Sequence, residues 1–483
     1  MRHQVNKLRE LHFGKSSEQS RSFSGDLIGD HSKSSRKKRP RGQQPGSPGH
    51  GRRRHSELPC REEVYELTEQ EAACSDCGLP YEQTELENVS EEVEFDVRLY
   101  RRRKRRPQYR QICRCDKVPG LISAPAPLRA FPASDYSDNF WLEVVLLKYE
   151  YQMPLQRISG LLRGHGLDNP APGTLCGGIE RVSDMLIPLH DEVVKRDKGA
   201  MLRHMDESDL KVFIELEGRE NQRWCLWQSS TQDTCVFSLT PRHNAEVPED
   251  YLKDTPRQAF VCVDRHRAYA NLEQTVSYCW AHVRRDFVKL GRSESSSLEW
   301  AVKWIKRIKR IYRLNHKRIA ARENPECFPE AQAELEQTVE ATRQQCENEL
   351  NRPYNWTTVN RRKVLESLQR YWGGLTVFVS DPGIPMDNNA AERLFRPLAK
   401  LRKASYGVHS EHFGHITAML LSIFATLRLN NIAARPFLRE YFSAAAARGG
   451  VIDAEAVKAF LPWHLPEERR KRLMSAKDPP DKS

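Results

Sequence analysis

The sequence lacks an unbroken apolar run of about 18 residues, the length that a membrane-spanning helix needs. The longest apolar stretch, residues 416–429, is interrupted by Thr417, Ser422, Thr426 and Arg428, and it predicts a buried helix instead. A leading signal peptide is also missing, and the 12 cysteines are scattered rather than gathered in a small disulfide framework. These absences argue against a membrane or secreted protein and favour the reducing cytoplasm.

Acidic residues are fewer than basic residues. The chain has 77 Lys and Arg residues against 65 Asp and Glu residues, a formal net charge of +12. Such an excess favours a polyanionic partner, although a soluble protein that is merely basic has the same composition. Residues 31–56 hold nine Lys and Arg, no acidic residue, and many Gly, Pro and Ser. We therefore expect a disordered basic linker over residues 31–58, which either contacts phosphates or serves as a solvated tether.

Two cysteine pairs in residues 59–117 flank a predicted β-hairpin. The pairs are Cys74 with Cys77 and Cys113 with Cys115. Four converging thiolates suit a tetrahedral zinc ion, but the second pair is tighter than the usual zinc spacing, so a reduced hairpin without metal is the alternative. Residues 98–106 carry seven basic residues in nine, and we expect this run to lie along the hairpin as a phosphate-binding ribbon. Its candidate DNA contacts are Arg101, Arg102, Arg103, Lys104, Arg105 and Arg106.

The rest of the chain changes its hydrophobic pattern several times. Residues 118–197 become helical and predict either a helix-turn-helix unit that binds DNA or a purely structural pair of helices. Residues 198–293 show successive strand patterns, and residues 294–372 show helical spacing typical of an insertion. Residues 373–445 are expected to complete the α/β core, with a short strand at 377–379 and a helix capped by Asp387. We expect residues 446–483 to form a tail that is disordered from residue 466.

Three acidic residues occupy positions that an α/β sheet can bring together. Asp206 ends the first predicted strand, Asp264 ends the fourth, 58 residues later (264 − 206), and Glu392 lies on the helix after Asp387. If the first and fourth strands are neighbours, as in a ribonuclease H-like sheet, the two aspartates stand side by side. Clustered carboxylates repel one another unless cations lie between them, and two Mg²⁺ ions held in this way catalyse phosphodiester displacement. Taken singly, each acid also has an explanation as a turn or capping residue.

The sequence around these acids resembles the insertion-sequence-66-type DDE transposases, over nearly the whole chain. The matching segments are residues 8–18, 42–50, 151–157, 173–175, 204–208 (HMDES), 263–269 (VDRHRAY), 279–287 (CWAHVRRDF) and 387–393 (DNNAAER). The resemblance implies an α/β fold with a ribonuclease H-like core, a helical insertion before the glutamate, and a zinc-finger-like β domain. It also implies that Asp206, Asp264 and Glu392 bind Mg²⁺ or Mn²⁺ and catalyse cleavage and strand transfer at insertion-sequence ends. The family usually begins with a longer coiled-coil helix, so residues 1–30 are expected to be a helical remnant.

The resemblance also implies partners: double-stranded DNA at the terminal repeats and the target, a second copy of the chain, and accessory proteins encoded by the element. The expected location is the cytoplasm, at the nucleoid. The residues near the acids that we expect to contact DNA are His282, Arg284, Arg285, Asn388, Arg396, Lys400, Arg402 and Lys403. Asn388 has a second explanation as a support for Glu392, and His282 and the two arginines after it have one as packed or solvated side chains. Two other functions share this fold: a DNA-binding remnant without activity, and a metal-dependent nuclease that cuts without joining.

Overall fold

The computed structural model describes residues 98–110, 121–214, 223–352 and 358–474, without 133 and 169, together with the single residues 79 and 112. The chain divides into two compact units, residues 25–102 and the remainder, and every helix and strand named below belongs to the second unit. The N-terminal helix, the basic linker and the cysteines Cys74, Cys77, Cys113 and Cys115 lie outside the described residues. The zinc prediction therefore stays a prediction.

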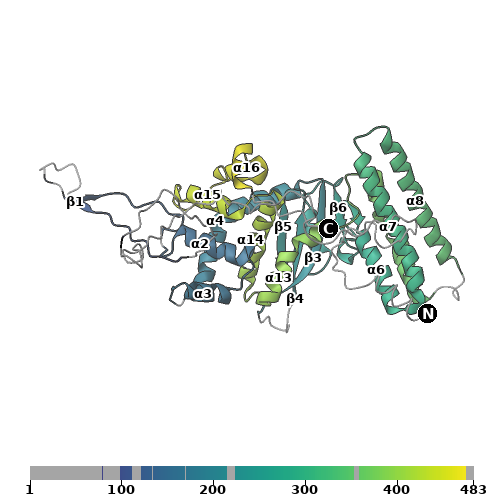
Figure 1. Ribbon diagram of the computed structural model, residues 1–483, viewed down its shortest axis with the longest axis horizontal. Coiled ribbons are helices and arrows are strands. Elements are labelled where there is room, and N and C mark those ends of the chain that lie inside the picture. The colour runs from purple at the N-terminus through teal and green to yellow at the C-terminus, as the bar shows by residue number, and fades with distance from the viewer. Residues whose placement is uncertain are drawn as a thin grey trace. The chain divides into compact units, whose positions relative to one another are not determined.

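A five-stranded mixed sheet lies at the centre of the second unit (Figure 1). Its strands are β3 (Leu202–Lys211), β4 (Arg223–Ser230), β5 (Cys235–Thr240), β6 (Phe260–Val263) and β7 (Thr275–Tyr278), in the order β5-β4-β3-β6-β7. β3, β4 and β5 form an antiparallel meander, whereas β6 and β7 run parallel to β3. β6 is almost wholly buried, as its continuous apolar sequence requires of a central strand. The first and fourth strands of the sheet are neighbours, as predicted.

β3 is longer than the sequence predicted. We expected it to end at Asp206, but residues 202–211 form one strand whose pairing with β4 extends from His204 to Lys211. β6, in contrast, pairs only with residues 202–204 of β3. Asp206 therefore lies in mid-strand, just where β3 continues past β6 and is no longer paired with a strand on that side.

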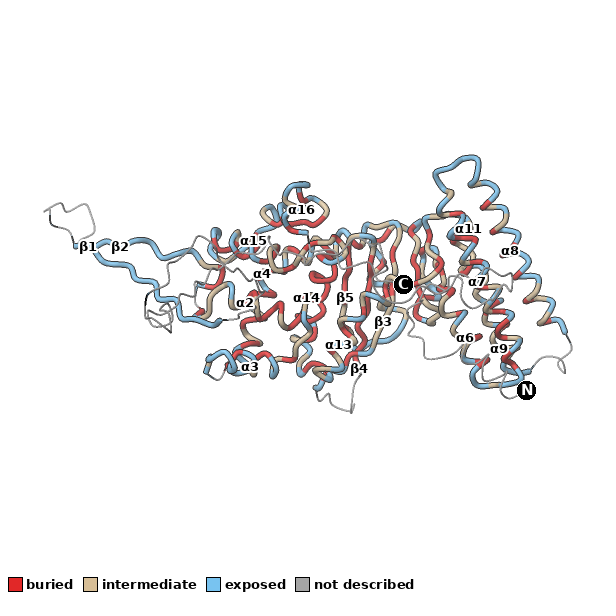
Figure 2. Tube along the Cα trace, viewed as in Figure 1, coloured by how far each residue is buried: buried red, intermediate tan, exposed pale blue. Residues whose placement is uncertain are grey.

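Helices α4 (Pro172–Lys198) and α14 (Glu411–Leu429) pack against the outer strand β5. Ser422 Oγ accepts a hydrogen bond from the Phe237 backbone N–H (2.8 Å), and Thr426 Oγ1 accepts one from the Cys235 N–H (3.0 Å). These hydroxyls satisfy alternate N–H groups of an edge strand that has no further strand beside it. α14 is apolar and long enough to cross a membrane, but 67% of its apolar window is buried within the protein (Figure 2). The predicted buried helix over residues 416–429 is confirmed.

The helices before the sheet pack into the same core. α2 (Asp138–Val145) continues into a π-helical turn at Leu146–Glu150 and is followed by α3 (Leu155–Gly164) and α4. α4 begins at Pro172, and Leu175, Ile179, Val182 and Leu186 on it are all buried. Gly178 lies directly under Trp141 of α2, where an added Cβ would come within 1.9 Å of the indole ring. Both a structural and a base-reading pair of helices bury an apolar face in this way, so DNA binding by this region stays a prediction.

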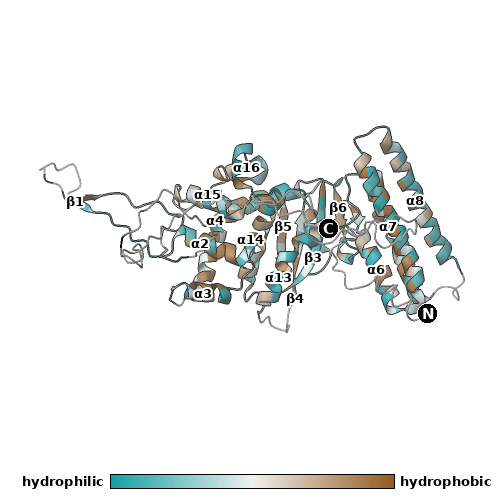
Figure 3. Ribbon diagram, in the orientation of Figure 1, coloured by the Kyte–Doolittle hydropathy of each residue, from teal (hydrophilic) through white to brown (hydrophobic). Residues whose placement is uncertain are grey.

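A separate group of helices follows β7. It consists of α6 (Trp280–Ser293), α7 (Leu298–Ala321), α8 (Cys327–Leu350), α9 (Val359–Arg370) and the short α10 (Trp372–Leu375) and α11 (Val377–Ser380). These helices share an apolar core that also includes Cys262 of β6, and polar residues cover much of α8 (Figure 3). The strand expected at 377–379 is wrong, because these residues form α11. The buried Arg318 donates hydrogen bonds to the carbonyls of Phe378 and Val379, so these groups are not free to pair in a sheet.

The last described residues fold back onto the core through α15 (Ala434–Ala446) and α16 (Glu467–Leu473). Leu473 is fully buried, and its carbonyl accepts a hydrogen bond from the Ala433 N–H (2.8 Å). The prediction of disorder from residue 466 is therefore wrong for residues 466–474. Charged residues dominate α16, and Leu473, its one apolar residue, was not enough to predict this helix from the sequence.

The basic run before the sheet is not part of a strand. β1 (Gln108–Arg110) pairs with β2 (Leu121–Ser123), and the predicted phosphate-binding ribbon precedes β1. All its residues are exposed, namely Arg101, Arg102, Arg103, Lys104, Arg105 and Arg106. The hairpin predicted between the two cysteine pairs lies almost wholly outside the described residues, so the phosphate-binding ribbon stays a prediction.

Candidate active site

Three elements bring Asp206, Asp264 and Glu392 toward one another. Asp206 lies in β3, Asp264 directly follows β6, and Glu392 is on α12 (Asn389–Leu394). His204 is paired with Cys262, so each aspartate lies two residues further along its strand (206 − 204 and 264 − 262). The two aspartates therefore occupy equivalent positions on neighbouring parallel strands.

The charges of Asp264 and Glu392 both act on Asp206. Burial raises the pKa of Asp206 to about 8, and the negative charges of Glu207, Asp264 and Glu392 add to the rise. The Glu207 backbone N–H donates a hydrogen bond to Asp206 Oδ1 at 3.0 Å, and this bond lowers the pKa of Asp206, against the other effects. Without a cation, Asp206 holds a proton at neutral pH. An all-carboxylate donor set with this much uncompensated charge fits Mg²⁺ or Mn²⁺, which prefer oxygen ligands.

The three carboxylates are spread too widely for one ion to bind all of them in this arrangement. Among the described residues, they do not form a group whose ligand atoms all lie within 4.8 Å of one another. Asp264 Oδ1 also accepts a hydrogen bond from the His266 N–H at 2.7 Å, which fixes the turn after β6.

The buried side chain of Asn388 fixes the start of α12 against the sheet. Its Nδ2 donates to the Met205 carbonyl at 2.6 Å, and its Oδ1 lies 2.8 Å from His204 Nδ1. Its backbone N–H donates to Cys279 Sγ at 3.1 Å. Asn388 is 0% exposed, so the prediction that it contacts DNA is wrong. It supports Glu392 indirectly, by holding the helix that carries it.

Further contacts attach the segment before α12 to the end of the sheet. The backbone N–H of Trp280 donates to the Met386 carbonyl at 3.0 Å. The hydroxyl of Tyr312 on α7 donates a hydrogen bond to Asp387 Oδ2 at 3.2 Å. Asp387 Oδ1 accepts a hydrogen bond from the Asn389 N–H (3.2 Å), but Asn388 occupies the N-cap position, one residue later than predicted. These contacts bring the chain back to the sheet after the helical insertion.

Two side chains of α6 lie beside Glu392. Arg285 Nη2 is 3.5 Å and His282 Nε2 is 3.8 Å from Glu392 Oε1. Burial lowers the pKa of His282, as does the positive charge of Arg285, although Asp264 and Glu392 act in the opposite direction. The His282 imidazole is therefore neutral at pH 7. Both residues contact the third acid, and their predicted role in binding phosphate is untested.

The other predicted DNA contacts lie on α6 and on α13 (Arg396–Ser405). Four of them are exposed, namely Arg284, Arg396, Lys400 and Lys403. Arg402 is half-buried, and its Nη1 donates to the Asp209 carbonyl (2.6 Å) and to Ser208 Oγ (3.2 Å). Arg402 thus connects α13 to the far part of β3.

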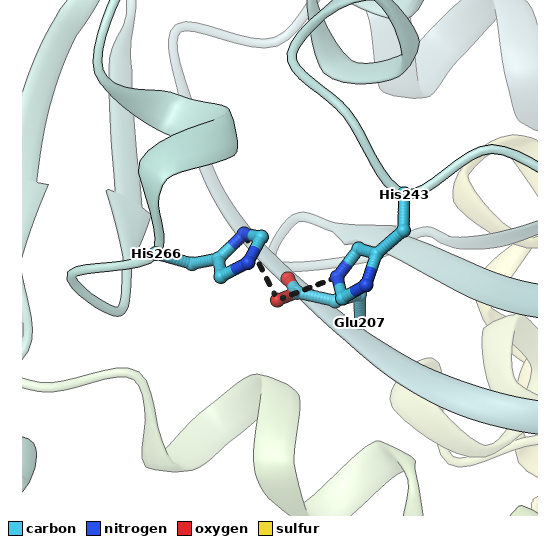
Figure 4. Close-up of side chains that lie close together, drawn as sticks. All are labelled: Glu207, His243 and His266. Atoms are coloured by element: carbon cyan, nitrogen blue, oxygen red, sulfur yellow. Dashed lines mark ion pairs between the residues drawn. The ribbon is translucent and has the colours of Figure 1, made fainter.

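The polar residues on the other face of β3 were not predicted from the sequence. Glu207 follows Asp206 directly, and its side chain lies beside those of His243 and His266 (Figure 4). The signal that was available is the adjacent acid pair in β3 together with the histidine two residues after Asp264. The contribution of His243 depends on the fold, because it comes from the loop after β5.

Comparisons with known proteins agree with the extent of this core. Residues 134–416 match the model of the family described as Transposase IS66 family. The chain is 23% identical over 400 residues to "Uncharacterized protein y4jD" of Sinorhizobium fredii (strain NBRC 101917 / NGR234), an alignment of 78% of this chain and 75% of the relative. It is 21% identical over 428 residues to "Uncharacterized protein y4hP" of the same organism, covering 82% of this chain and 74% of the relative. The family match includes all three acids and every element between α2 and the start of α14.

Proposed function

Because the chain belongs to the IS66 transposase family, we propose that it is a DNA transposase that cleaves and joins DNA with Asp206, Asp264 and Glu392 as its metal-binding catalytic residues. The observation that carries the proposal is the convergence of these acids from β3, β6 and α12 on one charged environment. A carboxylate cluster of this kind is costly to bury unless it binds cations.

We further propose that the sheet and its flanking helices form a ribonuclease H-like core. Three features support this assignment: the strand order β5-β4-β3-β6-β7, the antiparallel meander of the first three strands, and the parallel pairing of β3 with β6. The helices α7, α8 and α9 would then be an insertion between the sheet and the helix that carries Glu392.

The three acids and the residues beside them would have different roles in the reaction. Asp206, Asp264 and Glu392 would hold divalent ions, which polarise the scissile phosphate and activate a water or a 3′-hydroxyl. Asp206 would give up its proton when the ions bind. Arg285 and His282 would keep the Glu392 carboxylate in place before binding, and Asn388 would fix the helix on which it lies.

Double-stranded DNA is the proposed partner, and the exposed cations on α13 are the proposed phosphate contacts nearest in sequence to Glu392. Arg396, Lys400 and Lys403 are all exposed. Replacing them together with Gln should weaken binding to any DNA sequence and reduce the salt dependence of that binding, because phosphate contacts release counterions.

The test is a cleavage-and-joining assay on DNA that carries the element's ends, with Mg²⁺ or Mn²⁺. We expect Asp206→Asn, Asp264→Asn and Glu392→Gln each to abolish both reactions while DNA binding persists, and Asp209→Asn, on the same strand as Asp206, to remain active. Cleavage without joining would assign a nuclease instead. Binding without either reaction in the wild type would assign an inactive DNA-binding remnant.

A further inference from the structure

A second cluster of metal-ligating side chains lies on the face of β3 opposite to Asp206. Successive side chains of a strand point to opposite faces, so Glu207 projects away from Asp206. It meets His243, from the loop between β5 and α5 (Glu246–Leu252), and His266, from the turn between β6 and the 3₁₀ helix Arg267–Tyr269 (Figure 4). One ligand atom from each of the three lies within 4.8 Å of the others.

The distances between these atoms match the spacing of ligands around a metal ion. Glu207 Oε1 is 3.5 Å from His266 Nδ1 and 3.6 Å from His243 Nε2. Both separations exceed the usual length of an N–H···O hydrogen bond. They are close to about 3.4 Å, the edge of a tetrahedron whose ligands lie about 2.1 Å from the metal.

Neighbouring groups already orient the ligands. The hydroxyl of Tyr269, which is 0% exposed, donates to Glu207 Oε2 and leaves Oε1 directed at the two imidazoles. His266 Nδ1 accepts a weak hydrogen bond from the Ala268 N–H (3.4 Å), so this nitrogen is not protonated, and an ion bound at its lone pair would replace that hydrogen bond. The rings of His243 and His266 are stacked, with centroids 4.7 Å apart and planes 13° from parallel, so the exposed His243 ring would have to turn for both lone pairs to point at one ion. The hydrogen bond from Tyr269 to Glu207 Oε2 is an outer contact of the kind that is typical of built metal sites.

We propose that Glu207, His243 and His266 bind a divalent transition-metal ion. Two imidazoles and one carboxylate are a donor set that suits Zn²⁺, with water as the fourth ligand, whereas Mg²⁺ prefers oxygen ligands alone. The ion would connect β3 with the loop after β5 and the turn after β6. Glu207 is adjacent to Asp206, and His266 is two residues from Asp264, so this ion would fix the backbone beside both aspartates.

The test uses Co²⁺ as a spectroscopic substitute for Zn²⁺, added to the full chain after chelator treatment. We expect one equivalent of Co²⁺ to give the visible d–d absorption of a low-coordinate nitrogen and oxygen site. His243→Ala, His266→Ala and Glu207→Gln should each lose this band and one equivalent of bound metal. His165→Ala, which removes another exposed histidine, should retain both. Thiolate ligands would produce intense sulfur-to-metal charge-transfer bands, so binding by cysteine pairs is distinguishable.

Thermal unfolding supplies a second measurement that does not depend on activity. A ligand that binds only the folded state raises the Tm. Zn²⁺ should therefore raise the Tm of the wild type and of His165→Ala, but not that of His243→Ala. The His243 side chain is 46% exposed, so its removal should leave the fold intact without metal. Equal Co²⁺ stoichiometry and equal Zn²⁺-dependent Tm in all four variants and the wild type would overturn the proposal.

Discussion

Asn388→Ala tests how α12 is held against the sheet. The substitution removes the donor to the Met205 carbonyl (2.6 Å) and the partner of His204 Nδ1 (2.8 Å), at a position that is 0% exposed. Two hydrogen bonds contribute about 1 kcal/mol each, and a buried acceptor left unpaired costs about 1–3 kcal/mol more, so we expect a loss of about 3–5 kcal/mol in the free energy of unfolding. Because Glu392 lies on this helix, kcat for strand transfer should also fall while DNA affinity stays the same.

Urea unfolding, with single-turnover strand transfer on the same preparations, measures both effects. Asn389→Ala is the matched control, since this neighbouring asparagine is only half-buried and contributes its backbone N–H, not its side chain, to the bond with Asp387. The control should stay within about 0.5 kcal/mol of the wild type, as is usual for substitutions away from buried networks. If Asn388→Ala unfolds at the same urea concentration as Asn389→Ala and transfers strands as fast, the reasoning is refuted.

Three other predictions concern stability. The folded-state pKa of Asp206, about 8, lies above its ordinary value of 3.8, so the folded chain binds a proton that the unfolded chain has lost between these pH values. Stability without divalent ions should therefore fall as pH rises from about 4 to about 8, by at most about 1.4 kcal/mol per pH unit, and Asp206→Asn should flatten this slope in pH-dependent unfolding. Thr426→Val should cost about 1–3 kcal/mol because it leaves the Cys235 backbone groups at the edge of β5 unpaired, and an unchanged Tm would contradict that role. Arg318→Met should cost about 2–4 kcal/mol because it leaves the Phe378 carbonyl without this donor and the Val379 carbonyl with Gln332 as its side-chain donor, and hydrogen exchange should then accelerate in α11, whereas unaltered exchange there would count against it.

Local sequence patterns were sufficient to predict the parts of the site that lie on regular, strongly apolar elements. The continuous apolar run of β6 predicted a central strand, and the position of Asp264 directly after it followed. The end of β3 could not be predicted in the same way. Asp206, Glu207, Ser208 and Asp209 have low strand propensity, yet pairing with β4 keeps them extended.

The less predictable features depend on contacts between distant residues. Asn388 resembled a surface residue at a helix start, and only its contact with Met205, 183 positions earlier, makes it a buried support. His243 and His266 approach Glu207 because β5 and β6 lie on either side of the β4–β3 pair in the sheet. No local spacing in the sequence reveals this arrangement. α16 seemed disordered because its charges outnumber its apolar residues, but Leu473 attaches it to the core.

The most direct test of the catalytic assignment is the location of Mn²⁺ by anomalous diffraction from crystals of the protein with end DNA. The account predicts one Mn²⁺ between the carboxylates of Asp206 and Asp264, and Glu392 as a ligand in the same site, at oxygen distances of about 2.0–2.3 Å. An ordered complex in which Mn²⁺ binds elsewhere, while these three carboxylates hold no ion at the DNA, would contradict it.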